Sequence, residues 1–221
     1  MTAKSPRKIK IPHRKKTSRR SQPVILTVGH SNRSIEDFLA LLKAHNVQRL
    51  VDVRTVPRSR HNPQFNRLPT VADLPARTDD ALPQTLRRAR IDYTHLPNLG
   101  GLRRAKPDSV NTGWNNSSFR GFADYMQTPE FATGLARLEK LAQTKRCAIM
   151  CAEAVPWRCH RSLLADALTV RGHAVEHIMT PTRRSLHKLT PFARVRGKKI
   201  TYPATRATRA HAAKSAARAV K

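Results

Sequence analysis

The chain has 221 residues, a length typical of one domain with extra segments, and a formal net charge of +29 at pH 7. No run of residues approaches the roughly 18 apolar positions of a membrane-spanning helix, and no secretory signal is visible, so we expect no membrane partner. Three cysteines, an odd number clustered within residues 147–159, argue against a secreted disulfide framework and predict a reducing, cytoplasmic compartment.

The positive charge is concentrated at the two ends of the chain. Residues 1–23 contain nine Lys and Arg and residues 182–221 contain twelve, with no acidic residue in either segment. We therefore predict a basic disordered tail at 1–23, an α/β domain at 24–181 and a basic Ala/Arg/Lys tail at 182–221. Because Lys and Arg that neutralise phosphates release condensed counterions, such tails favour binding to nucleic acid, either DNA or RNA. A tail that is only solvated is the alternative.

From residue 24 onward, short apolar runs that predict strands alternate with apolar residues at helical spacing that predict helices. In chain order the prediction is a strand at 24–28, a helix at 34–46, a strand at 47–54, a helix at 81–90, a strand at 91–96, helices at 119–127 and 129–144, a strand at 147–151, a helix at 159–172 and a strand at 173–178. Two long polar loops, 55–80 and 97–121, interrupt this alternation.

The alternation predicts an α/β fold, with a mostly parallel sheet of about five strands flanked by helices in a single domain. The first strand, helix and strand form a βαβ unit, which requires parallel pairing. Ser34 is expected to cap the first helix, because Asp37 follows three residues later in the position of a capping box.

Polar residues follow three of the predicted strands. Gly-His-Ser-Asn (29–32) follows the first strand, Asp-Val-Arg (52–54) ends the second, and Cys-Ala-Glu (151–153) ends the fourth. Ligands of parallel sheets bind beyond the carboxyl ends of the strands. We therefore expect these residues to meet in one concave polar pocket.

Cys159, His160 and Arg161 begin a predicted helix, where free N–H groups and the helix dipole attract anions. The candidates for binding a small phosphorylated or otherwise anionic ligand are Arg54, Arg161, His160 and Asn32. In the alternative interpretation, Arg161 forms a structural ion pair with Asp52 or Glu153, and Cys159 is packed as a small apolar residue.

Glu153, Asp52 and His30 are the candidate catalytic residues. Two carboxylates at neighbouring strand ends can act as acid and base if burial raises one pKa while a nearby arginine keeps the other low. The alternative is a network of Asp–Arg and Glu–Arg pairs that only holds the strand ends together.

Cys151 and Cys159 are possible reactive thiols, because Cys151 ends a strand before a loop and a helix. Cysteine-dependent phosphatases place five residues between Cys and Arg, whereas six separate Cys151 from Arg158, and Glu153 in that loop would repel a phosphate. A buried structural role for Cys151 is the alternative. We predict no metal site and no cofactor, because zinc-binding cysteines are usually separated by two to four residues, and adjacent Cys159 and His160 are not expected to bind one ion.

Five stretches carry a family resemblance: TVGHSNRS, LVDVRTVPRS, YTHLPNLGG, RGFADYM and CAEAVPWRCHR. In this order, over roughly residues 24–181, they resemble the bacterial and archaeal family catalogued as domain of unknown function 488. The Cys-x-Glu-x-x-Pro-x-x-Cys-His-Arg pattern is its most specific part. The resemblance implies an α/β fold and a shared polar site, and it implies no particular chemistry.

Together, the strand-end residues and the basic tails favour an enzyme that acts on a nucleotide or nucleic acid as a hydrolase or lyase. A non-catalytic nucleic-acid-binding protein is the first alternative, and a thiol-dependent enzyme similar to phosphatases or sulfurtransferases is the second. Aromatic residues in or beside the long loops can stack on bases or pack the loops onto the sheet. These residues are Phe65, Trp114, Phe119 and Tyr125. The sequence gives no indication of the oligomeric state.

Overall fold

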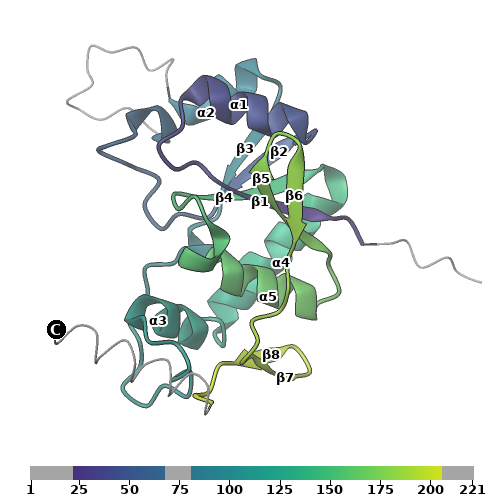
Figure 1. Ribbon diagram of the computed structural model, residues 1–221. Helices are drawn as coiled ribbons and strands as arrows, with labels where there is room; N and C mark the ends of the chain where they lie inside the picture. Colours follow the sequence, from purple (N-terminus) through teal and green to yellow (C-terminus); the bar gives the residue numbers. More distant parts are fainter. Residues whose placement is uncertain (1–21, 68–80, 206–221) are drawn as a thin grey trace, which may run out of the picture.

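A computed structural model describes residues 22–67 and 81–205 of the chain. A six-stranded sheet lies between two layers of helices, with α1 and α2 on one face and α3, α4 and α5 on the other (Figure 1). Five strands are parallel, and β6 pairs antiparallel with β5 at the edge. The predicted single α/β domain with a mostly parallel sheet is confirmed.

The elements follow the predicted order up to β5, and three further strands come after it. The elements are β1 (Ile25–Gly29), α1 (Ile35–Ala44), β2 (Arg49–Asp52), α2 (Leu82–Arg88), β3 (Asp92–His95), α3 (Ser117–Tyr125), α4 (Pro129–Thr144), β4 (Cys147–Cys151), α5 (Arg161–Val170), β5 (Val175–Thr180), β6 (Arg183–Leu186), β7 (Arg194–Arg196) and β8 (Lys199–Thr201). The expected cap of α1 is present, because the Ser34 side chain accepts a hydrogen bond from the backbone N–H of Asp37 at 3.0 Å.

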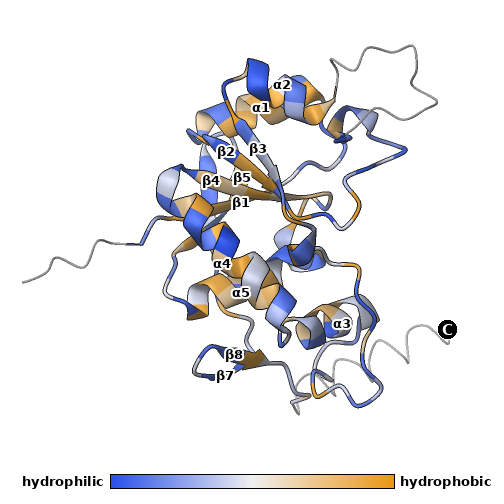
Figure 2. Cartoon of the chain, turned by 180° about the vertical axis from the view of Figure 1, so that it is seen from behind, coloured by the Kyte–Doolittle hydropathy of each residue, from blue (hydrophilic) through white to orange (hydrophobic). Residues whose placement is uncertain are grey.

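Side chains of the central strands alternate between two hydrophobic cores, as the two-residue period of a strand requires. In β1, Leu26 and Val28 belong to the core that includes residues of α1 and α2, whereas Ile25 belongs to the core that includes residues of α4 and α5. Figure 2 shows the consequence: the central strands are hydrophobic, and the helices around them have both hydrophobic and hydrophilic parts.

The strand order β3-β2-β4-β1-β5-β6 inserts β4 between β1 and β2. The two strands of the predicted βαβ unit are therefore parallel but not hydrogen-bonded to each other. The chain leaves β1 toward α1 on one face of the sheet and leaves the neighbouring β4 toward α5 on the opposite face (Figure 1). Adjacent strands whose connections diverge in this way leave a crevice at their carboxyl ends.

The folded chain extends beyond residue 181, the predicted end of the domain, into the segment predicted to be a basic tail at 182–221. Residues 183–201 include the strands β6, β7 and β8, and Tyr202 is fully buried in the core with Leu163 and Ile149. The high positive charge of this segment led to the prediction of a tail. Its strands expose their basic side chains, while the apolar side chains of Ile200 and Tyr202 are buried and anchor the segment to the core. The tail at 1–21, the loop residues 68–80 and the tail at 206–221 lie outside the described residues.

A chain of buried hydrogen bonds fixes this C-terminal segment to the sheet. Asp166 in α5 accepts from the Tyr202 hydroxyl at 2.9 Å, and its other oxygen lies 2.8 Å from the Nε2 atom of His187. The His187 ring contacts His177 at 3.0 Å, and His177 contacts the hydroxyl of Thr27 in β1 at 2.8 Å. Burial, with the positive charges of His187 and Arg161, lowers the pKa of His177 to about 4.

No helix in the described part of the chain combines the length and the apolar character needed to cross a membrane.

The pKa of His177 makes stability depend on pH. As the pH falls below 6.5, the unfolded chain takes up a proton that folded His177 takes up only near pH 4. The stability present above pH 6.5 is therefore lost progressively between pH 6.5 and pH 4. Urea denaturation should show that His177→Gln loses less free energy of unfolding between pH 7 and pH 5 than the wild type, by about 2 kcal/mol.

The control is His61→Gln, which removes an exposed histidine. It should reproduce the pH dependence of the wild type. Equal pH dependences of His177→Gln and the wild type would show that His177 does not contribute.

Candidate functional site

A cavity of about 380 Å³ lies at the carboxyl ends of β1, β2 and β4. Its wall is formed by residues that follow these three strands, by residues 101–102, and by the start of α3. The predicted site residues in this wall are His30, Arg54, Cys151, Glu153, Cys159 and His160. Segments that are far apart in the chain therefore meet in one concave pocket. Three other predicted site residues, Asp52, Arg161 and Asn32, are not in its lining.

Close approach of the β1 and β4 ends shapes the floor of the cavity. Gly29 is paired with Cys151, and the backbone N–H groups of His30 and Ser31 donate to the carbonyls of Cys151 and Ala152 at 3.0 and 2.8 Å. A side chain at position 29 would collide with the carbonyl of Glu153. Glycine is thus required here for the strand ends to remain in contact.

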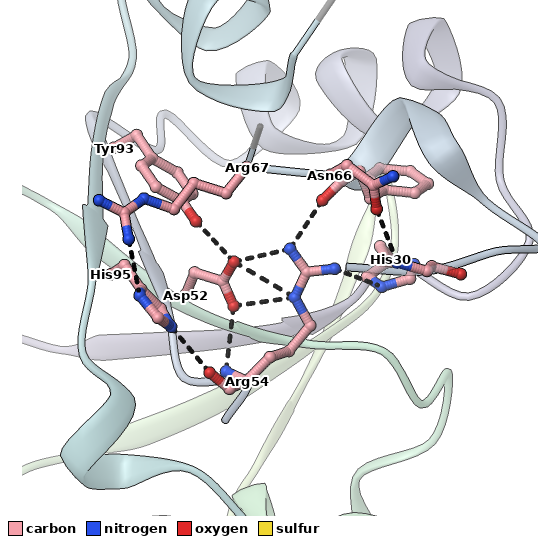
Figure 3. A network of polar contacts seen from close by, with 9 residues as sticks. His30, Asp52, Arg54, Asn66, Arg67, Tyr93 and His95 are labelled. Atoms are coloured by element: carbon pink, nitrogen blue, oxygen red, sulfur yellow. Dashed lines mark hydrogen bonds and ion pairs between the residues drawn. The ribbon is translucent and has the colours of Figure 1, made fainter. Parts of the chain in front are cut away.

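Asp52 and Arg54 form a buried ion pair beside the cavity (Figure 3). The Asp52 carboxylate accepts from the Arg54 side chain at 2.7 and 3.0 Å, from the Arg54 backbone at 3.0 Å and from the Tyr93 hydroxyl at 2.7 Å. Burial opposes the charge on Arg54, but the hydrogen bonds and charge of Asp52 outweigh it and raise the pKa of Arg54. Because Asp52 is fully buried and outside the lining, its role here is to position Arg54.

His30 is a neutral, oriented imidazole. Its ring stacks on Phe65 with centroids 4.3 Å apart, and its Nδ1 atom lies 2.8 Å from the carbonyl of Ser31. Its Nε2 atom lies 3.4 Å from a guanidinium nitrogen of Arg54, so Nε2 is the acceptor and Nδ1 carries the proton. Burial is the main cause that lowers the pKa of His30 to about 4, and the charge of Arg54 adds to it.

Arg161 is almost fully buried at the start of α5, behind the cavity. Its guanidinium donates to the backbone carbonyl of Glu153 at 2.5 Å and to the hydroxyl of Thr27 at 3.4 Å. Neither of the carboxylates considered as its partners, Asp52 or Glu153, forms an ion pair with it. Within the described residues, Arg161 instead fixes the backbone that follows β4.

Cys151, Cys159 and His160 form a compact cluster in the cavity wall. The Nδ1 atom of His160 lies 3.8 Å from the Cys151 sulfur and 3.6 Å from the Cys159 sulfur. The hydrogen bond from Cys151 lowers the pKa of Cys159 well below its usual value, against burial and with help from His160. The same hydrogen bond, together with burial, raises the pKa of Cys151.

The prediction of no metal site assumed that adjacent Cys159 and His160 would not bind one ion. The geometry of this cluster contradicts that assumption. Adjacent Cys159 and His160 do face one point, because the backbone is extended at Cys159 (φ −132°, ψ 145°) and helical at His160 (φ −55°, ψ −14°). Their donor atoms and the Cys151 sulfur all lie within 4.8 Å of one another. The short helix Pro156–Arg158 returns the chain from β4, so the seven residues between the cysteines do not separate them.

The lining also includes three exposed charged side chains: Glu153, Arg58 and Arg158. Glu153 is the one carboxylate among the described lining residues. Arg58 was missed because it lies in an irregular loop that has no periodic pattern, and Arg158 was considered only for its spacing from Cys151. Polar Ser59, which lies in the same loop as Arg58, was also missed.

The aromatic residues of the loops pack against other side chains. Trp114 contacts the rings of Phe119 and Tyr202, with centroids 4.8 and 5.6 Å apart, and Phe65 lies buried between His30 and Phe38. Tyr125 supports the guanidinium of Arg103 at 3.9 Å. These contacts agree with the alternative in which the aromatic residues pack the loops onto the sheet.

Comparison with protein families finds a match over residues 34–168, more than half of the chain, to the family described as Domain of unknown function DUF488. The matched range includes β2, β4 and the start of α5, and therefore Arg54, Glu153 and the Cys151–His160 cluster. It does not include β1 and His30. No curated protein and no solved structure matches the chain.

The buried pair predicts a large loss of stability when Asp52 is neutralised. Asp52→Asn leaves the Arg54 guanidinium buried without a counter-charge, which should reduce the free energy of unfolding by about 3 kcal/mol. The control is Asp92→Asn. Asp92 is 40% exposed and pairs with Arg49 and Lys145 at the surface, so its loss should cost less than about 1 kcal/mol. Urea denaturation at pH 7 measures both values, and equal small losses would contradict the assigned role of Asp52.

Proposed function

The chain belongs to the family described as Domain of unknown function DUF488, and we propose that it is an enzyme acting on a small phosphorylated substrate of the nucleotide class. The observation that carries this proposal is the lining of the strand-end cavity. Three arginines, Arg54, Arg58 and Arg158, and the carboxylate of Glu153 face the same cavity of about 380 Å³.

The arginines favour an anionic ligand. Guanidinium groups bind phosphate oxygens through charge-assisted and often bidentate hydrogen bonds. Arg54 is held in one orientation by Asp52, so it needs little further ordering when a ligand binds. Arg58 and Arg158 are exposed and can move toward a phosphate that enters.

The rim favours a ligand that also has an apolar part. Val56 and Leu102 line the cavity and are 58% and 70% exposed. Large exposed apolar side chains beside a polar cavity are typical of a binding surface. A nucleotide combines these properties, because its phosphate suits the arginines and the face of its base suits the rim.

Glu153 is the proposed general acid or base, since it is the carboxylate that can reach a ligand in this cavity. Neutral His30 offers few ways to exchange a proton, because its Nε2 atom faces Arg54 and its Nδ1 atom faces Ser31. We therefore assign His30 and Asp52 to positioning Arg54. The reaction proposed is hydrolysis or elimination at the base or the sugar-phosphate, with Glu153 transferring the proton.

The basic ends of the chain extend the proposal to nucleic acid. Residues 1–23 contain nine Lys and Arg and no acid, so they would bind a polyanion with a strong dependence on salt. The free thiols of all three cysteines agree with a reducing, cytoplasmic setting for this activity.

A thiol-dependent reaction is the second candidate. The specific observation in its favour is that the Cys159 sulfur lies 3.6 Å from His160 in the wall of the same cavity. A thiol next to an imidazole is the usual arrangement of a cysteine nucleophile.

Ligand binding tests the role of the arginines. Isothermal titration with AMP, ADP and inorganic phosphate should show that Arg58→Ala and Arg158→Ala each weaken binding about 10-fold or more. The control is Arg194→Ala, which removes an exposed arginine of β7 and should leave binding unchanged. Equal effects of all three substitutions would indicate that only net charge matters, and the proposed pocket would be wrong.

Turnover tests the role of Glu153. On a panel of nucleotides and sugar phosphates, Glu153→Gln should lower kcat at least about 100-fold on any substrate that the wild type converts, with KM little changed. Loss of turnover in Cys159→Ser but not in Glu153→Gln would support the thiol candidate instead.

The same panel separates an enzyme from a binding protein. Replacing the Lys and Arg of 1–23 and 206–221 by Gln in the full chain removes the charge of both ends. If the wild type converts no compound, and this variant loses all binding to DNA and RNA, the non-catalytic alternative is correct.

A further inference from the structure

The wall of the cavity contains three donor atoms whose arrangement fits a metal ion. They are the sulfurs of Cys151 and Cys159 and the Nδ1 atom of His160, all within 4.8 Å of one another. Bond lengths of about 2.3 Å to sulfur and about 2.0–2.1 Å to nitrogen, at tetrahedral angles, place sulfur and nitrogen ligands about 3.6 Å apart. The two sulfur–nitrogen distances here are 3.6 and 3.8 Å.

From this agreement we propose that Cys151, Cys159 and His160 form a binding site for one zinc ion. The inference concerns the thiol and imidazole groups, and it goes beyond the proposed function without depending on it. Thiolate and imidazole are the ligands that zinc prefers, whereas magnesium and calcium prefer oxygen.

The surrounding residues hold the three ligands in place. The His160 ring is packed edge-on against Phe122, with centroids 5.0 Å apart, and against Gly101, where any side chain would collide with Nδ1. The backbone N–H of Arg161 points at the Cys159 sulfur at 3.5 Å. A hydrogen bond to a ligand sulfur of this kind stabilises thiolates that bind metal.

The number of ligands indicates an open site. Among the described residues, no fourth His, Cys, Asp or Glu joins the cluster. Structural zinc sites have four protein ligands, whereas sites with three protein ligands leave one position for water or substrate. Since all three ligands line the cavity, the open position would face the same space as Arg54 and Glu153.

Zinc titration of the full-length reduced protein tests the site. Competition with a colorimetric chelator should show one equivalent of zinc bound to the wild type. Cys151→Ser, Cys159→Ser and His160→Asn should each weaken this binding at least about 100-fold, which exceeds the 10–100-fold typical for loss of a supporting residue around a metal.

The matched control is Cys147→Ser. Cys147 is a buried thiol at the opposite end of β4, so its loss should leave the stoichiometry and affinity unchanged. The site would be wrong if the three ligand variants bound zinc as tightly as Cys147→Ser does. Far-UV circular dichroism of each variant identifies any that is unfolded.

Cobalt substitution keeps the test valid even if a variant does not fold. Wild-type protein with one equivalent of cobalt(II) should show thiolate-to-cobalt charge-transfer absorption and the intense visible bands of a tetrahedral ion. Absence of both would overturn the proposal. Arg58→Ala should keep these bands while it loses affinity for phosphate, so failure of the metal site and failure of the anion site are distinguishable.

Discussion

The contact between the ends of β1 and β4 is the constraint on which the site depends. The two strands pair in parallel up to Gly29 and Cys151, and the chain then leaves them on opposite faces of the sheet. No side chain is tolerated at Gly29, because the carbonyl of Glu153 occupies that space. The cavity therefore results from the topology of the sheet, and its chemistry comes from whichever residues follow these strands.

Two buried arginines hold this region together in different ways. Arg54 has a full counter-charge in Asp52 and faces the cavity, so its positive charge is fixed in orientation and still available to a ligand. The guanidinium of Arg161 has only a carbonyl and a hydroxyl as hydrogen-bond partners within the described residues, and the backbone N–H of Arg161 donates to the Cys159 sulfur. A buried guanidinium without a carboxylate favours negative charge nearby, and the charge of Arg161 acts to lower the pKa values of both Cys151 and Cys159.

The sequence was sufficient to predict the five parallel strands, the order of the elements up to β5 and the edge of the sheet where the cavity lies, because short apolar runs and the residues after them are local features. The sequence did not predict the features that depend on contacts between residues far apart in the chain or on the local backbone conformation. The basic residues of 183–201 resemble a tail, but a few apolar anchors such as Tyr202 fix them to the core. The direction in which Cys159 and His160 point depends on a change of backbone conformation that spacing alone does not reveal.

The cavity combines two kinds of ligand chemistry in one lining. Arg54 and Arg58 offer hydrogen bonds to hard oxygen anions, whereas Cys151, Cys159 and His160 offer soft donors to a metal. Each group alone has a structural explanation, such as a strand-end ion pair or packed thiols. Structural roles would not require the two groups to line the same cavity, but both of them do. Glu153 is an exposed carboxylate in the lining of this same cavity, where a proton donor or acceptor could reach a ligand bound by either group.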